Sequence, residues 1–375
     1  MSAVVLVEQA AGWPQRYVEE RARLTAVLAP WLVAAAGVEH IGSTAVPGLG
    51  GKPSLDLMAG VRSLDEARDA VVPLFADGWV HDPHRPDALH FTLHRTEAGA
   101  ANLHLSEPGS ALWVERLAFR DALRGDPALA ADYTALKRAL AGEGLAAGKR
   151  ELVAGALARS AIALPPPRPA GYDGLALAAA LVAQWQLLAL HAPTLELAAP
   201  TRVTGWRNSE ALAHLTLQPG LLVRFLAAVE PGEVTGDLAT NLVGTRRLAE
   251  AIDTAARRHA GASAVDLRTA VDAAAPVLLR ADPGRRVTTL QGAITLDAYL
   301  RTRCVEAVVH GGDLVPPLSP HPAALAVAAE ALTAVLHGRA PTATPAPTDP
   351  LGWVEAATGR RAAPPSIAGL LPLSS

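Results

Sequence analysis

The sequence predicts a multidomain protein with an α/β (α+β) N-terminal part and an all-α helical bundle in its C-terminal part. The chain has 375 residues. Because a domain with a single hydrophobic core is usually shorter than this, two domains are expected. Residues 164–172 read LPPPRPAGY, and consecutive prolines forbid helix and favour an extended, semi-rigid linker. Strand-like and helix-like patterns alternate before this run, whereas helical periodicity dominates after it.

The N-terminal domain, residues 1–163, contains both kinds of secondary structure. We expect a helix over 14–36, strands over 38–41 and 54–61, a helix over 64–76, and helices at the end of the domain. Two runs of alternating residues, 88–95 and 101–106, flank a turn-rich segment and predict a β-hairpin.

The C-terminal domain, residues 173–339, has apolar residues with a period near 3.6, which predicts an antiparallel bundle. The expected helices cover 173–192, 209–229, 237–259, 263–279, 295–311 and 323–337. The tail, residues 340–375, is rich in Pro, Thr and Ala, and we expect it to form a loosely packed cover over the bundle.

Composition and charge narrow the classes of partner. The net charge is −3 and Lys and Arg form no block, so we expect no nucleic-acid partner. No run of about 18 apolar residues suggests a membrane span. The N-terminus lacks the basic region of a secretory signal, which favours the cytoplasm. The single cysteine, Cys304, excludes an internal disulfide and a cysteine-based zinc cluster. Any metal ion must therefore bind to His and carboxylate side chains.

Three residues of the C-terminal domain form a candidate metal site. Glu306 and His310 are four residues apart on one expected helix and project from the same face. His214 lies among leucines in another helix, where an unbonded imidazole is costly. Two imidazoles and one carboxylate suit zinc or a similar divalent cation and leave a coordination position open. Asp313 either orients the His310 ring or makes a solvent contact at the helix end.

Three segments carry a resemblance to a known family. TRVTGWRNSEALAHL, YLRTRCVEAVVHGGDL and WVEAATGR resemble segments of the mycothiol-dependent maleylpyruvate isomerase family, which has a DinB-like bundle fold. The resemblance covers about residues 170–361 and implies that His214, Glu306 and His310 are the metal ligands. It also implies a thiol such as mycothiol as cofactor, with the metal lowering the pKa of the sulfur so that a thiolate attacks a small electrophilic substrate.

Other side chains near these segments have competing interpretations. Cys304 lies about 200° round the helix from Glu306 and is expected to be a core residue rather than a nucleophile. Arg301 and Arg303 either receive a carboxylate substrate or the polar tail of a thiol, or are solvated or paired with acids.

The densest motif of the N-terminal domain is VEHIGSTAVPGLGGKPSLDL. It predicts a strand, a turn containing Gly42 and Ser43, a glycine-rich loop with Lys52, and a second strand bearing Asp56. Small residues allow backbone N–H groups to approach a phosphate, a lysine neutralises the phosphate, and a carboxylate can hold Mg²⁺. The same stretch is also compatible with a turn that serves packing alone.

The motif resembles the GrpB family, a branch of the nucleotidyltransferase superfamily. HIGSTAVPGL, KPSLDL and NLHLSE carry the resemblance, which spans about residues 5–163 and implies nucleotide binding by Gly42, Ser43, Lys52, Asp56 and His104, with Mg²⁺.

The chain departs from the superfamily's set of three carboxylates. Met58 lies on the same face as Asp56, and histidines of the hairpin stand where the third carboxylate is expected. The polar face of the hairpin then binds a nucleotide, holds another metal through His104 and Asp56, or is an exposed sheet face without a ligand.

Three functional hypotheses remain open at this stage. The first is a metal-dependent isomerase or transferase that uses a small thiol and is fused to a nucleotide- or phosphate-binding domain. The second makes nucleotidyl transfer the main activity and the bundle a binding module. The third is a non-enzymatic ligand sensor. The sequence carries no signal for an oligomeric state.

Overall fold

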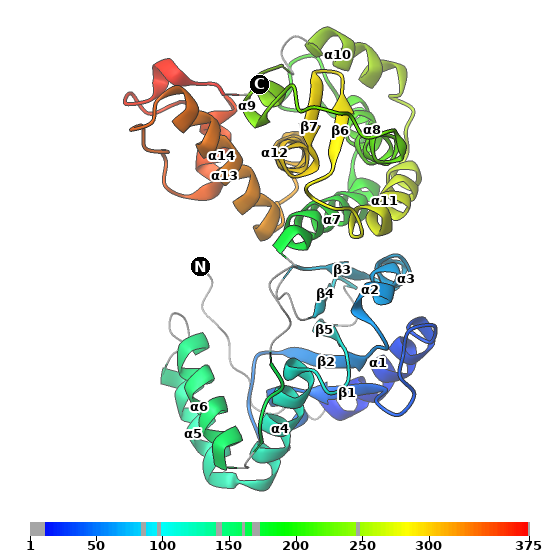
Figure 1. Ribbon diagram of the computed structural model, residues 1–375, viewed down its shortest axis with the longest axis vertical. Helices are drawn as coiled ribbons and strands as arrows, with labels where there is room; N and C mark the ends of the chain where they lie inside the picture. The colour runs from blue at the N-terminus through cyan, green and yellow to red at the C-terminus, as the bar shows by residue number, and fades with distance from the viewer. Residues whose placement is uncertain are drawn as a thin grey trace. The chain divides into compact units, whose positions relative to one another are not determined.

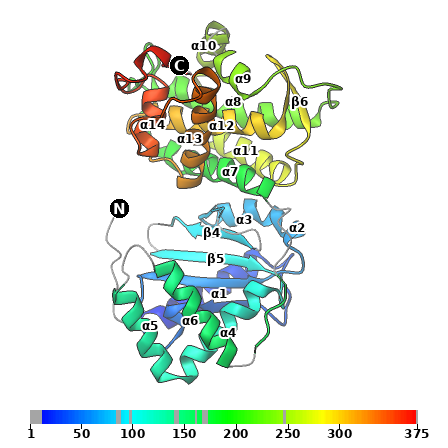
Figure 2. The same ribbon diagram turned by 60° about the vertical axis from the view of Figure 1, so that its left-hand side comes forward.

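The computed structural model describes residues 12–83, 88–95, 99–139, 145–159, 162–166, 173–244 and 248–373. The chain divides into two compact units, Met1–Ala170 and Gly171–Ser375, drawn in Figures 1 and 2. The first unit mixes helices and a sheet, and the second is helical apart from one small hairpin. Within the expected linker, residues 164–166 have no regular structure, and residues 167–172 lie outside the described residues.

A five-stranded mixed sheet forms the centre of the first unit. The strands are β1 (Val38–Ile41), β2 (Ser54–Gly60), β3 (Trp79–His81), β4 (Leu89–Leu93) and β5 (Ala100–Ser106). Their order is β1-β2-β5-β4-β3, with β2 parallel to β5 and the other neighbours antiparallel. The predicted hairpin is confirmed as β4 and β5. Strand β3 was not predicted, because three residues are too few to show alternation.

Helices surround this sheet. They are α1 (Trp13–Val27), α2 (Leu64–Ala67), α3 (Val71–Ala76), α4 (Ala111–Gly125), α5 (Pro127–Ala139) and α6 (Leu145–Arg159), with short 3₁₀ turns η1 (Ser43–Ala45) and η2 (Arg68–Ala70). Figure 2 shows α4, α5 and α6 grouped side by side. They share an apolar cluster that includes Phe119, Leu129 and Tyr133.

Two helix predictions in this unit were too long. The helix expected over 14–36 ends at Val27, because Pro30 disfavours helical geometry at the preceding residue and cannot donate a backbone hydrogen bond. The helix expected over 64–76 is interrupted by η2, and Pro73 removes the bond that a helix would make to the Asp69 carbonyl.

The second unit is built from helices α7 (Asp173–His191), α8 (Asn208–Ala227), α9 (Leu238–Gly244), α10 (Ala249–Arg258), α11 (Ala264–Leu278), α12 (Leu296–Asp313), α13 (Pro322–Arg339) and α14 (Pro350–Ala357). Helix α12 packs against α7, α8 and α13, and α11 packs against α7 and α8. The single helix expected over 237–259 is two helices, α9 and α10. A hairpin of β6 (Arg286–Thr289) and β7 (Gly292–Thr295) was not predicted.

Among the described residues, one segment, Ala176–Thr194, is long and apolar enough to cross a membrane by length and composition. It covers most of α7, and 72% of its most apolar window is buried inside the structure. Trp185 and Leu181 in this helix have no exposed surface. The segment therefore has the burial of a core helix in a helical unit.

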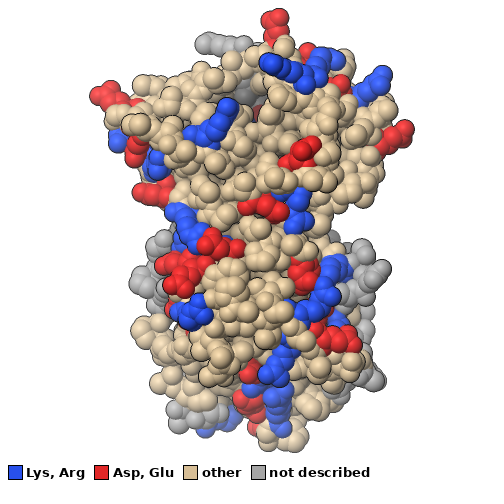
Figure 3. Space-filling view, turned by 90° about the vertical axis from the view of Figure 1, so that its right-hand side faces the viewer, with Lys and Arg blue, Asp and Glu red and all other residues tan. Residues whose placement is uncertain are grey.

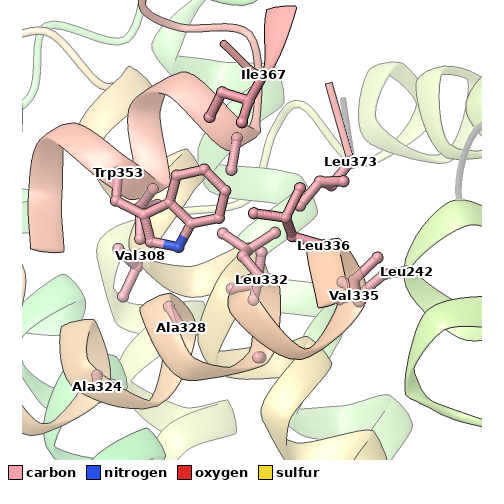
Figure 4. Packing of buried hydrophobic residues seen from close by; sticks show 14 residues of the cluster. Leu242, Val308, Ala324, Ala328, Leu332, Val335, Leu336, Trp353, Ile367 and Leu373 are labelled. Carbon is pink, nitrogen blue, oxygen red and sulfur yellow. The ribbon is translucent and has the colours of Figure 1, made fainter. Parts of the chain in front are cut away.

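The C-terminal tail is not a loose cover, so this expectation was wrong. Trp353 of α14 is 2% exposed and Leu373 is fully buried. Both belong to an apolar cluster with residues of α9, α12 and α13, shown in Figure 4. The Trp353 indole donates hydrogen bonds to the Ala329 carbonyl and the Thr333 hydroxyl, each at 3.1 Å. The prediction was based on the Pro-, Thr- and Ala-rich composition of the tail and did not consider its few large apolar residues.

Charged side chains are mixed by sign on the face drawn in Figure 3, where Lys and Arg lie among Asp and Glu. Close ion pairs in the first unit include Arg23 with Asp77 and Arg120 with Glu39. Such interspersed charge does not create the single-sign field that steers polyanions to a surface.

Candidate functional site

The structure brings the three predicted metal ligands together between α8 and α12. His214 projects from α8, and Glu306 and His310 project from α12. The Oε2 atom of Glu306 lies 3.2 Å from His214 Nε2 and 3.6 Å from His310 Nε2. One ligand atom from each residue lies within 4.8 Å of the other two. No second group of this kind occurs among the residues that the structure describes.

Asp313 accepts a hydrogen bond from the ring nitrogen of His310 that faces away from Glu306. Its Oδ2 atom lies 3.0 Å from His310 Nδ1, so Nδ1 is the donor and Nε2 faces Glu306. Asp313 is fully buried, which excludes the alternative of a solvent contact. A carboxylate on the far ring nitrogen fixes the tautomer and orientation of a metal-binding histidine.

Arg360 is a site residue that sequence reasoning missed. Its Nη2 and Nε atoms donate to the two carboxylate oxygens of Asp313, at 2.8 and 3.2 Å. Arg360 ends the WVEAATGR segment, but nothing in the local pattern shows that it reaches a residue 47 positions earlier. The C-terminal segment therefore contributes to the environment of His310.

The other side of the site contains Gln218 and Trp206, which the sequence reasoning did not assign, next to Arg303. The Gln218 amide nitrogen lies 3.0 Å from His214 Nε2, and Arg303 Nη1 donates to Gln218 Oε1 at 3.0 Å. Gln218 is four residues after His214, so its position on the same helix face was the available signal. The Trp206 ring lies 5.6 Å from the His214 ring and 5.9 Å from the His310 ring, measured between centroids.

The buried charges of the site depend on one another. Burial disfavours their charged forms, but hydrogen bonds from His214 and His310 hold the pKa of Glu306 well below its usual range. Against the same effect of burial, Asp313 and Glu306 raise the pKa of His310 to about 9. Burial lowers the pKa of His214. Near pH 7 the cluster thus has one neutral imidazole, one imidazolium and two carboxylates.

These residues fit a divalent metal ion. The Nε2 atoms of both histidines face the same Glu306 carboxylate, which is the donor set and convergence that zinc-binding sites use. A divalent cation would neutralise the negative charge of the buried carboxylates. In the metal-free protein, the proton on His310 neutralises part of this charge.

A cavity of about 650 Å³ opens beside the candidate metal site. His214, Glu306, Gln218 and Arg303 line it at this end, and apolar residues of α8 and α10 line much of the rest. Its size is typical of small-molecule sites.

The structure distinguishes between the interpretations of two neighbouring side chains, Arg301 and Cys304. Arg301 pairs with Asp297 at 2.9 Å and with Glu330 at 3.6 Å. Cys304 is fully buried, and burial raises the pKa of its thiol to about 12. Cys304 is therefore a core residue, as predicted, and Arg303 is the arginine that reaches the cavity.

A second cavity, of about 470 Å³, lies in the first unit and is lined by all five residues predicted to bind nucleotide: Gly42, Ser43, Lys52, Asp56 and His104. Gly42 has a φ of 71°, and a Cβ atom there would lie 2.5 Å from Asp56 Oδ2. The position thus requires glycine. The Asn102 amide donates to Asp56 Oδ1 at 2.9 Å across the β2–β5 pair.

Lys137 of α5 is a cavity residue that the sequence reasoning missed. Its Nζ atom donates to Ser43 Oγ at 2.8 Å and to the Gly50 carbonyl, and the side chain is buried, whereas Lys52 is exposed. Leu129, Tyr133 and Lys137 share one helix face at four-residue spacing, so a lysine at a core-facing position was the available signal.

Met58, on the strand that carries Asp56, is buried against Ile41 and Trp113. The His90 and His104 rings stack with centroids 4.6 Å apart, and Asp82 Oδ2 lies 3.4 Å from His90 Nδ1. Both histidines are buried, so this part of the sheet face is not exposed.

Comparison with known proteins agrees with the two-part organisation. The family described as GrpB protein matches residues 3–154. A UPF0157 protein of Halalkalibacterium halodurans is 31% identical over 140 residues, which cover 37% of this chain and 70% of the relative. The chain belongs to the GrpB family.

Further relatives match the same part of this GrpB-family chain. A UPF0157 protein of Streptomyces coelicolor is 38% identical, and YqkA of Bacillus subtilis is 30% identical. Each match covers 35% of the chain, and the chain spans 66% and 38% of the lengths of these relatives. The crystal structure of the conserved protein GrpB from Enterococcus faecalis is 23% identical, covers 42% of the chain and 99% of that structure, and gives a TM-score of 0.38.

The second unit of the GrpB-family chain carries a different domain. Residues 177–315 match the Mycothiol maleylpyruvate isomerase N-terminal domain. All three candidate ligands and Asp313 lie inside this match, whereas Arg360 lies beyond it.

Proposed function

We propose that the second unit is a DinB-like bundle that binds a divalent metal ion through His214, Glu306 and His310. Zinc is the ion that this donor set favours. In this proposal the unit uses a small thiol such as mycothiol to isomerise or transfer a group on a small electrophilic substrate. The observation that supports it is three convergent ligand atoms within 4.8 Å of one another, next to a cavity of about 650 Å³.

The residues of the chain have separate tasks in this chemistry. Asp313 fixes His310 so that Nε2 faces the site. Trp206 lies against both imidazoles, and the apolar cavity walls limit the access of water. A bound metal ion would supply Lewis acidity that lowers the pKa of a thiol sulfur. Arg303, at the same end of the cavity, supplies positive charge for an anionic substrate group.

Cobalt substitution tests whether a thiol reaches the metal. Adding mycothiol to the Co²⁺-loaded full chain is expected to produce a new sulfur-to-cobalt charge-transfer absorption, because the site leaves a coordination position open. The alcohol analogue should not produce it, and neither should thiol added to the His214→Ala variant. An unchanged spectrum with saturating thiol would refute the thiol chemistry while leaving metal binding in place.

Metal affinity is expected to depend on pH through His310. Its pKa of about 9 means that metal displaces a proton below pH 9, so the apparent affinity should rise about tenfold per pH unit from 7 to 9 and then level off. In the metal-free protein, the stabilisation from the protonated ring is complete below pH 6.5 and is lost as pH rises through 9. Zinc titrations against a competing chelator at three pH values measure the slope.

The Asp313→Asn variant is the control for this slope, since it removes the negative charge that raises the pKa of His310. The slope between pH 7 and 9 should become shallower in this variant. The same slope in both proteins would show that another group supplies the proton.

A second candidate function belongs to the first unit. We propose that its 470 Å³ cavity binds the phosphates of a nucleotide, with a nucleotidyltransferase-like fold as scaffold. Lys137 and Lys52 would neutralise the phosphates, and Asp56 would hold a magnesium ion. Turnover assays with nucleotides and with thiol adducts separate catalysis at either site from a sensor role.

The nucleotide proposal predicts magnesium-dependent binding of ATP or CTP that is lost in Asp56→Ala, with the affinity reduced at least about tenfold. Isothermal titration with and without Mg²⁺ measures this. The matched control is Asp69→Ala, because Asp69 is a carboxylate residue of η2 that lies outside the cavity. Absence of binding by any nucleotide to the wild-type chain would end this proposal.

A further inference from the structure

The cavity beside the metal site has two chemically different parts. At the metal site it is lined by His214, Gln218, Arg303 and Glu306. Away from these polar side chains, Leu221 and Phe225 of α8 and Ile252 and Ala255 of α10 form apolar walls. A volume of about 650 Å³ accommodates a body considerably larger than a short polar acid.

Arg303 is held in a fixed orientation at the polar end. Its Cζ atom lies 5.0 Å from the centre of the Tyr299 ring, and Nη1 donates to Gln218 Oε1. Nε donates to the Thr302 hydroxyl at 3.1 Å. Across the described ranges of the chain, no carboxylate lies within 4.0 Å of this guanidinium, in contrast to Arg301. The charge of Arg303 acts on Glu306 through space, without a close ion pair. A positioned, partly buried arginine of this kind is suited to receive a ligand carboxylate.

We infer that the electrophilic substrate of this site is a carboxylic acid with an extended apolar body. Its carboxylate binds to Arg303 and its alkyl or aryl portion lies between α8 and α10. This inference rests on the proposed function for the position of the reacting end. The binding selectivity that it predicts can nevertheless be measured without the metal.

Chain length provides the first test. Butanoate, hexanoate, octanoate and decanoate are titrated into the metal-free full chain by calorimetry. The dissociation constant should fall roughly fourfold for each added methylene until the chain fills the cavity, because each methylene leaves water. A dissociation constant that does not change with chain length would overturn the inference.

Two pairs of variants locate the ligand. Arg303→Gln should weaken every acid by about tenfold or more and leave the matched alcohols unchanged, whereas Arg258→Gln, at an exposed arginine of α10 that does not line the cavity, should have little effect. Ala255→Trp should weaken decanoate and spare butanoate, because the indole occupies the apolar part. Thr254→Trp, on the exposed side of α10, should affect neither acid.

The results distinguish this inference from the proposed function. Chain-length-dependent binding that depends on Arg303, together with a negative cobalt–thiol experiment, would retain the ligand class and overturn the thiol chemistry. The opposite result would retain the proposed function and overturn this inference. In that case the cobalt–thiol experiment is positive, and the dissociation constants of the acids do not change in the Arg303 and Ala255 variants. Arg303→Lys, which keeps the charge, should recover part of the affinity if the fold is intact.

Discussion

Replacing His310 with alanine is expected to reduce bound metal from about one ion per chain to less than a tenth of that amount. The structure shows three protein donors converging on one point, so the loss of one imidazole leaves only two. The variant also leaves the buried Asp313 without its histidine partner. Elemental mass spectrometry of chain purified without a histidine tag measures the metal content, and His214→Ala should behave in the same way.

His259→Ala is the matched control for this measurement. His259 lines the same cavity but is exposed and lies outside the convergent group, so this variant should retain the wild-type metal content. Equal and negligible metal in all of these proteins, even after reconstitution with zinc, would contradict the metal site.

Replacing Trp353 with alanine is expected to lower the free energy of unfolding of the second unit by about 3–5 kcal/mol. The indole is 2% exposed, packs in the cluster of Figure 4, and donates two hydrogen bonds to α13. Its removal leaves a cavity and leaves the Thr333 hydroxyl oxygen without the hydrogen bond that the indole donates to it. Urea unfolding followed by circular dichroism, with hydrogen exchange of α13 peptides to assign the transition, measures the loss.

Leu351→Ala provides the comparison on the same helix. Leu351 is 43% exposed, so its truncation should cost less than about 0.5 kcal/mol. Similar small losses for both variants would show that α14 contributes little to the stability of the unit.

The sequence pointed to the convergent group of His214, Glu306 and His310 because the evidence for it is local. Glu306 and His310 share a helix face at a fixed spacing, and a histidine among leucines marks His214. Arg360 could not be found in this way, since it meets Asp313 only through the packing of the C-terminal segment. Gln218 and Lys137 were available from helical spacing, but a pattern does not distinguish a polar side chain that lines a cavity from one that faces solvent.

Most of the long periodic helices were predicted, whereas two short strand features and the division of 237–259 into α9 and α10 were missed. The limits of α7, α8 and α11 were within two residues of the expected ones. Strand β3 and the β6–β7 hairpin have only three or four residues per strand, too few for a period to emerge. Prolines at 30 and 73 divided or ended helices that apolar spacing alone would have continued.

The bonds from Arg360 to Asp313 and from Asp313 to His310 join the C-terminal segment to the proposed metal site. Binding free energies are reciprocal, so whatever the docked segment adds to metal affinity, bound metal must add to the docking of the segment. Metal-loaded protein should therefore resist proteolysis after α13 better than metal-free protein. A cell short of the metal would hold a chain whose last residues are more easily cleaved, so turnover of the protein would follow metal supply.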